Sequence, residues 1–236
     1  RIKCLRNLEA RRQEIINAIT EQDKMTEELM ASLMKAVKLQ ELEDLYLPYR
    51  PKKRTRAMIA RERGLEPLAD MILNDMVTSG NPLDIAKEYI SEEVPTPEDA
   101  IQGASDIVAE IVSDSADFRA TLRKRMWKEG FIQAELVEDN EHKDQFLQYN
   151  EYAEPVRQMP SHRILAVNRG EKLGALKLAL TVPDESYIQY MVRGITKNEQ
   201  SIFSDVKASA VADAYKRLMF PALERDIRNE LTESAD

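Results

Sequence analysis

Residues 96–112 read TPEDAIQGASDIVAEIV, and this stretch decides the fold class. Thr96 can cap a helix through its hydroxyl, and Pro97 suits the first helical turn, where a missing N–H costs no hydrogen bond. Two acids then follow at the positive end of the helix dipole. The apolar positions beyond them recur at the spacing of one helix face, which predicts a helix with a buried stripe; they are Ile107, Ile111 and Val112.

The same apolar spacing continues on both sides of this stretch, and the commonest residues are good helix formers. Pro221 is expected to kink or break the last helix, because proline lacks the backbone N–H. Helices are predicted over residues 3–20, from Thr26 to Val37, over 42–46, from Thr55 to Gly64, from Ser115 to Gly130, from Ser161 to Arg169 with Gly170 just past its end, and over 211–231, with first-turn prolines at Pro67 and Pro82.

Two short stretches favour strands. Residues 131–137 are β-like, and residues 176–180 alternate with period two before Pro183. They predict a single hairpin or two-stranded ribbon. Only 7 glycines and 6% aromatic residues argue against a β-barrel or sandwich. We therefore predict a mainly α, multihelical fold with a short two-stranded β element, divided into a helical region over 1–130 and a mixed helical region over 131–236.

The residues that support catalysis or metal binding are few. A zinc site needs about four nitrogen or sulfur ligands, and the chain has three candidates, Cys4, His142 and His162. Ser161 precedes His162, but we interpret Ser161 as a helix cap rather than a nucleophile. The glycines form no phosphate-binding loop. We expect no enzyme activity, no cofactor and no metal.

The single cysteine also bears on the compartment. One cysteine allows no disulfide within the chain, which favours a reducing, cytoplasmic setting. No apolar run approaches the roughly 20 residues that span a bilayer, so we expect no membrane partner.

The charge is uneven. The chain has a formal net charge of −8, which taken alone disfavours a nucleic-acid partner. Residues 50–63, here called the basic segment, hold seven cations and the single acid Glu62, a balance of +6 that leaves −14 on the other 222 residues. The cations of the basic segment, all candidate nucleic-acid-binding residues, are Arg50, Lys52, Lys53, Arg54, Arg56, Arg61 and Arg63.

Two interpretations of the basic segment remain open. Its cations can neutralise phosphates and release counterions, with a loop and short helix forming a helix-turn-helix-like element. They can equally form a solvated face or pair with nearby acids. The flanking tyrosines can stack on bases, although packing beside Pro48 is the simpler role for them. The acids in question are Glu41, Glu43 and Asp44, and the tyrosines are Tyr46 and Tyr49.

The run YLPYRPKKRTR at residues 46–56 closely resembles the N-terminal region of the bacterial Tex family of transcription accessory proteins. Residues 160–171 and short segments within 214–233 resemble it in the same order. The resemblance implies a helical region with a helix-turn-helix-like element. In the family this region precedes an RNase H-like domain, helix-hairpin-helix units and a C-terminal OB-fold RNA-binding domain. The sequence begins without Met, and we expect a fragment of a longer protein.

Two functions follow as hypotheses. In the first, the chain is a non-catalytic, nucleic-acid-associated transcription module whose basic segment touches RNA or DNA backbone without reading sequence. Binding by this chain alone is expected to be weak, and the transcription machinery is a further candidate partner. In the second, the chain is a helical scaffold that docks proteins and supports the nucleic-acid-binding domains of the full-length protein.

Overall fold

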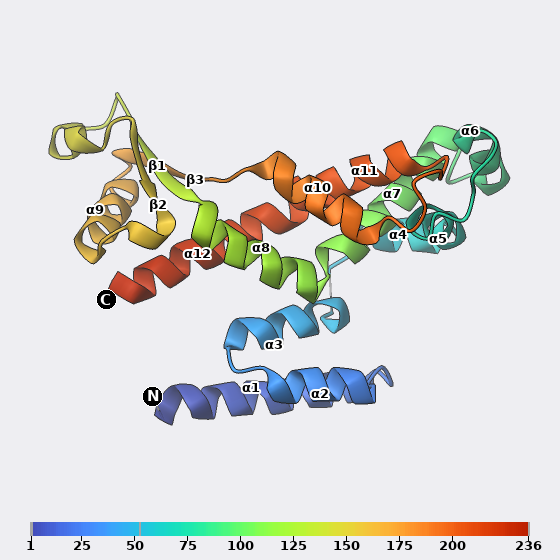
Figure 1. Ribbon diagram of the computed structural model, residues 1–236, viewed down its shortest axis with the longest axis horizontal. Helices are drawn as coiled ribbons and strands as arrows, with labels where there is room; N and C mark the ends of the chain where they lie inside the picture. The colour runs from blue at the N-terminus through green and yellow to red at the C-terminus, as the bar shows by residue number, and fades with distance from the viewer. Residues whose placement is uncertain (1, 52, 236) are drawn as a thin grey trace. The chain divides into compact units, whose positions relative to one another are not determined.

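The structure is a computed structural model that describes residues 2–51 and 53–235 (Figure 1). Within these residues it contains helices α1 to α12 and one three-stranded antiparallel sheet, so the predicted mainly α class is confirmed. The chain divides into two compact units. Unit 1 comprises Arg1–Ala120 and Met191–Leu218, and unit 2 comprises Thr121–Tyr190 and Met219–Asp236. The predicted division at residue 130 stays a prediction.

Three helices form the N-terminal part of unit 1. They are α1 (Ile2–Glu21), α2 (Glu27–Lys35) and α3 (Leu39–Tyr46), and their shared core includes Ile15, Ile19, Leu33 and Leu42. Thr26 caps α2 as predicted, since its hydroxyl accepts from the N–H of Leu29. Buried Arg12 of α1 donates to the carbonyls of Leu33 (3.0 Å) and Ala36 (2.7 Å). These are carbonyls that the end of α2 leaves without helical partners.

Helix α7 (Pro97–Ser113) is the packing centre of the rest of unit 1. Thr96 caps it as predicted, accepting from the N–H of Asp99 at 3.1 Å. Its buried stripe includes Ile107 and Val112, whereas Ile111, predicted to face inward, is 40% exposed. The helices that pack against α7 are α4 (Arg56–Glu62), α5 (Glu66–Leu73), α6 (Pro82–Ala86) and α11 (Ser204–Asp213).

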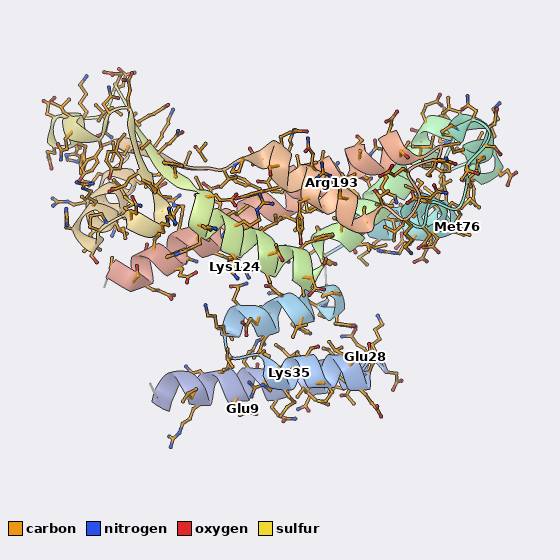
Figure 2. All side chains as sticks on the ribbon, viewed as in Figure 1. Glu9, Glu28, Lys35, Met76, Lys124 and Arg193 are labelled. Atoms are coloured by element: carbon orange, nitrogen blue, oxygen red, sulfur yellow. The ribbon has the colours of Figure 1, made fainter. Side chains whose placement is uncertain are left out.

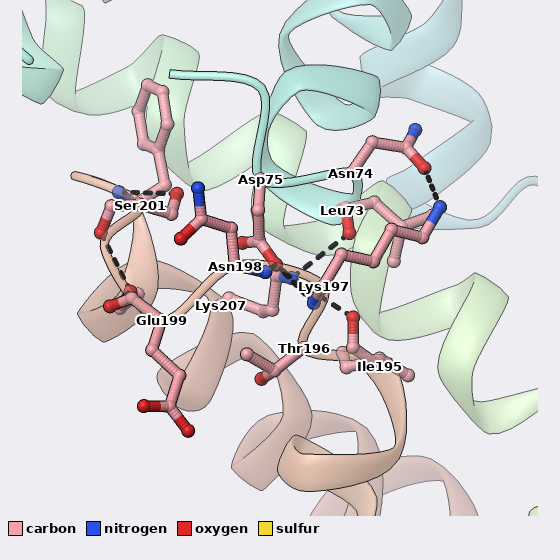
Figure 3. A network of polar contacts seen from close by, with 12 residues as sticks. Leu73, Asn74, Asp75, Ile195, Thr196, Lys197, Asn198, Glu199, Ser201 and Lys207 are labelled. Atoms are coloured by element: carbon pink, nitrogen blue, oxygen red, sulfur yellow. Dashed lines mark hydrogen bonds and ion pairs between the residues drawn. The ribbon is translucent and has the colours of Figure 1, made fainter. Parts of the chain in front are cut away.

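A buried ion pair joins α11 to the end of α5 (Figure 3). Lys207 Nζ lies 2.7 Å from Asp75 Oδ2, and the two side chains are 2% and 1% exposed. Backbone groups complete the network, because the ammonium donates to two carbonyls and the carboxylate accepts from two amides. The carbonyls belong to Leu73 and Ile195, and the amides to Lys197 and Asn198.

In unit 2, β1 (Phe131–Leu136) lies between β2 (Tyr152–Pro155) and β3 (Leu176–Thr181), all antiparallel. The two predicted strands are present as β1 and β3 and pair with each other, but the prediction that the β element has only two strands was wrong. The missed strand β2 has four residues, no apolar alternation and a proline, a residue that only an edge strand tolerates.

In unit 2, α9 (Ser161–Lys172) packs against β3 and against α12 (Phe220–Ala235). The predicted cap at Ser161 was wrong, because α9 starts at Ser161 after Pro160 without a side-chain cap bond. Gly170 lies inside α9 rather than past its end. A Cβ there would come within 2.5 Å of Leu176 Cδ1, so the glycine permits a close approach to β3.

The C-terminal helical stretch breaks as predicted. A π-helical segment over Ala214–Met219 separates α11 from α12, in which Pro221 is the second residue. Proline supplies no N–H to the preceding turn, which accounts for an irregular helix at this place. The remaining elements are α8 (Ala116–Glu129), α10 (Asp184–Ile195) and four 3-10 helices, Leu47–Tyr49, Lys87–Tyr89, Lys143–Tyr149 and Val156–Gln158. Within the described residues, every helix is too short or too polar to cross a membrane.

The Asp75–Lys207 pair predicts a stability that depends on pH. Burial pushes the pKa of Asp75 upward, but hydrogen bonds from Lys207 and the amides of Lys197 and Asn198 outweigh it, so the pKa is lowered. A lowered folded-state pKa contributes stability above the unfolded pKa of about 3.9, and this contribution is lost as pH falls through the folded value.

Asp75→Asn should therefore destabilise the chain by about 3 kcal/mol at pH 7, because it leaves the Lys207 ammonium buried without a counter-charge. Urea unfolding followed by circular dichroism measures this loss, which should shrink below about pH 4. The double variant Asp75→Asn/Lys207→Met is the control and should recover part of the stability. Equal stability of Asp75→Asn and the parent at pH 7 would contradict the prediction.

Candidate nucleic-acid interface

The basic segment runs from the end of the 3-10 helix Leu47–Tyr49 through a connection into α4. Thr55 caps α4 as predicted, accepting from the N–H of Met58 at 3.1 Å, and Gly64 follows the helix. Lys52 lies outside the described residues. Of the other predicted site residues, Arg61 is partly buried, and the exposed ones are Arg50, Lys53, Arg54, Arg56 and Arg63.

Glu110 of α7 forms hydrogen bonds to two residues of the basic segment. Its carboxylate accepts from Thr55 Oγ1 at 2.8 Å and from Arg61 Nη1 at 3.2 Å. The Arg61 and Glu110 side chains are 30% and 14% exposed, so water screens this pair less than a surface pair. Arg61 also lies 3.5 Å from Glu66. In this structure Arg61 therefore attaches α4 to α7, and the exposed cations are better placed to meet a ligand.

The acids next to the basic segment are engaged elsewhere. Glu43 pairs with Arg11 at 2.7 Å, and Asp44 pairs with buried Arg119 at 3.3 Å. Glu41 accepts from the backbone N–H of Val37 at 2.8 Å, at the start of α3. In the part of the chain that the structure describes, these contacts join the three acids to residues outside the basic segment.

Within the basic segment, Arg54 pairs with Glu62 at 2.9 Å, with side chains 69% and 57% exposed. Pairs this exposed contribute little to stability. A phosphate could displace Glu62 from Arg54 at small cost.

Arg56 and Arg63 lie in a different environment from Arg50 and Lys53. They line a hollow of about 410 Å³ with an apolar floor that includes Ile59, Leu65 and Val94. Three acids share the same wall, Glu93, Asp99 and Asp106. Burial raises the pKa of Asp106, against a hydrogen bond from Gln102 and the positive charge of Arg56. This part of the segment thus presents mixed charge, whereas the preceding connection presents exposed cations.

The two flanking tyrosines pack against the N-terminal core, Tyr46 buried and Tyr49 partly buried. Tyr46 is 9% exposed in the N-terminal core, with the Arg11 guanidinium 5.6 Å from its ring centroid. Tyr49 packs against the same core, and its carbonyl accepts from Gln22 Nε2 at 2.9 Å. Their positions support the packing interpretation over stacking on bases.

The residues considered for catalysis or metal binding are not assembled. His142 lies 3.3 Å from exposed Glu141, and His162 is exposed at the start of α9. The side chain of Cys4 lies outside the described residues. In the part of the chain that the structure describes, no three His, Cys, Asp or Glu side chains are grouped to hold a metal ion.

Comparison with known proteins identifies the family. The family described as Tex central region-like matches residues 78–236. The chain belongs to the Tex family. Over its whole length it is 38% identical to the transcriptional accessory protein Tex of Neisseria gonorrhoeae, of which it covers 32%. It is 42% identical, again over its whole length, to the uncharacterized protein YdcI of Bacillus subtilis, of which it covers 33%.

A more distant human relative is named S1 RNA-binding domain-containing protein 1. It is 27% identical over 94% of this chain, which covers 23% of it. The chain thus spans about a third of the length of the bacterial Tex relatives it matches. The basic segment precedes the matched Tex central region but lies within the part aligned to the bacterial relatives.

The contacts of Arg61 predict that it contributes to stability more than its exposed neighbour does. Arg61→Ala should lower the free energy of unfolding by about 1 kcal/mol, since it removes a charge-assisted hydrogen bond to partly buried Glu110. Arg63→Ala, the matched control, should change it by less than about 0.5 kcal/mol. Urea unfolding measures both. A larger loss for Arg63→Ala than for Arg61→Ala would contradict the role assigned to Glu110.

Proposed function

We propose that this chain is a non-catalytic, nucleic-acid-associated part of a Tex-family transcription accessory protein. Its basic segment contacts the backbone of RNA or DNA without reading base sequence. The observation that carries the proposal is the exposure of Arg50, Lys53 and Arg54. The preceding acids Glu43 and Asp44 bind Arg11 and Arg119, and the pair of Arg54 with Glu62 is itself exposed to solvent. Two relatives, named as a transcriptional accessory protein and an S1 RNA-binding domain-containing protein, agree with it.

The anchoring of the connection between residues 49 and 55 favours such a contact. At one end Gln22 binds the Tyr49 carbonyl, and at the other Glu110 binds Thr55. Cations on a chain held at both ends lose less conformational freedom on binding than cations on a free loop. Phosphate contacts of this kind position a protein on the backbone and carry no sequence information. The rest of the chain carries net negative charge and repels the negatively charged RNA or DNA, so we expect weak binding.

The second candidate function is protein docking. The observation that favours it is the hollow beside α4, where cations, acids and an apolar floor lie together. Such a surface suits a protein segment of mixed charge better than a uniformly anionic backbone. In this alternative the chain is a scaffold that supports the nucleic-acid-binding domains of the full-length protein.

Salt-dependent binding separates the two functions. Fluorescence anisotropy of labelled RNA and duplex DNA at about 50 and 200 mM salt gives the slope of log K against log salt. Replacing Arg50, Lys53 and Arg54 with Ala should reduce the slope on duplex DNA by about 2.7, at about 0.9 per lost phosphate contact.

The matched control removes three exposed lysines elsewhere in unit 1, Lys24, Lys35 and Lys216. It should change the slope less than the variant of the basic segment does. An equal change in both variants would overturn the assignment of the site. Failure of the unmodified chain to bind either nucleic acid at 50 mM salt would favour protein docking.

A further inference from the structure

The hollow of about 410 Å³ beside α4 has two walls of opposite charge. One wall is α4 with the residue that follows it, and the other is α7 (Figure 2 draws the side chains of both helices). The α4 wall carries Arg56 and Arg63. The α7 wall carries Asp99 and Asp106. The hollow therefore differs from the connection before α4, which presents exposed cations.

The charges of the two walls do not pair with each other. Among the residues that the structure describes, Arg56 and Arg63 have no carboxylate oxygen within 4.0 Å. The two aspartates accept hydrogen bonds from neutral side chains. Burial raises the pKa of Asp106, and the positive charge of nearby Arg56 acts against this rise. Both walls thus keep charge that a ligand can meet.

The floor between the walls is apolar. A Cβ on Gly103 would lie 3.4 Å from the Cβ of Ala60, so the two helices touch there. Leu65 and Val94 are 1% exposed and close the floor, while Ile59 is partly buried and can contact a ligand. A ligand in the hollow therefore meets apolar surface between cations on one side and acids on the other.

The spacing within each wall is that of one helix face. Arg56 and Arg63 are seven residues apart, as are Asp99 and Asp106, which corresponds to about 10.5 Å along a helix axis. The residues three and four positions after Arg56 and after Asp99 also line the hollow. A helix that lies in a groove uses the same i, i+3, i+4 and i+7 positions. An added β-strand would need free backbone partners, which the side of a helix does not offer.

We propose that the hollow binds an amphipathic helix of a protein partner. The apolar face of this helix lies on the floor, its acids face the arginines of the α4 wall, and its lysines or arginines face the aspartates of the α7 wall. Glu93 adds a third carboxylate to the lining, and the three repel an RNA or DNA backbone, which favours a protein ligand. The inference rests on the second candidate function, protein docking, and adds the chemistry of the partner.

The proposal divides the basic segment between two ligands. Arg50, Lys53 and Arg54 remain the residues proposed to contact nucleic acid, whereas Arg56 and Arg63 contact the helix. Because the two sets share no residue, each can be changed while the other is kept.

The first test measures fluorescence anisotropy of a labelled synthetic helix of about 15 residues with the full chain. The peptide has leucines on one face, glutamates along one edge of that face and lysines along the other. A lactam bridge on its far side keeps it helical, since a peptide of this length is marginally helical alone. Arg56→Glu/Arg63→Glu should weaken its binding about tenfold, because the glutamates then meet like charges.

The same variant should bind a second peptide, with lysines along both edges, more tightly than the parent chain does. A variant that merely failed to fold would not gain affinity in this way. Unchanged affinity of Arg56→Glu/Arg63→Glu for both peptides would overturn the helix site.

The control Arg50→Glu/Arg54→Glu makes the same change of charge in the connection before α4. It should weaken binding of the first peptide less than Arg56→Glu/Arg63→Glu does, and circular dichroism melts check that both variants fold. Failure of the parent chain to bind the first peptide, or an equal loss in the two variants, would also overturn the helix site. Neither result bears on nucleic-acid contact, which the salt dependence of RNA binding tests separately.

Discussion

The placement of the basic segment depends on two hydrogen bonds to the carboxylate of Glu110. One oxygen accepts from Thr55, the cap of α4, and the other from Arg61. Glu110 itself lies on α7, against which α4, α5, α6 and α11 pack. The buried Asp75–Lys207 pair in turn joins α11 to the end of α5. A group of exposed cations is in this way attached to the most extensively packed helix of unit 1.

An acidic protein presents cations more strongly to a ligand where the acids near them are engaged by other partners. Glu43 and Asp44, three to four positions before the 3-10 turn, bind Arg11 and Arg119. The net charge of −8 does not describe the basic segment, because short-range pairing affects which charges remain available to a ligand.

Local signals in the sequence were sufficient for most helices, because a cap and an apolar stripe act within a few residues. Thr96 shows this for α7. The failures have non-local causes. Gly170 lies inside α9 because β3 passes close to it, and β2 exists only through its pairing with β1. For the candidate site, the sequence predicted the cations of the basic segment, but the binding of Arg61 to Glu110, 49 positions away, required the fold.

We propose that nucleic acid meets this chain at the basic segment, which Glu110 holds against α7. Photocrosslinking of the full chain to RNA that carries 4-thiouridine, followed by mass spectrometry of the crosslinked peptides, tests it most directly. We expect crosslinks within residues 47–63 that disappear when Arg50, Lys53 and Arg54 are replaced with Ala. RNA that binds the chain and crosslinks only outside residues 47–63 would contradict it.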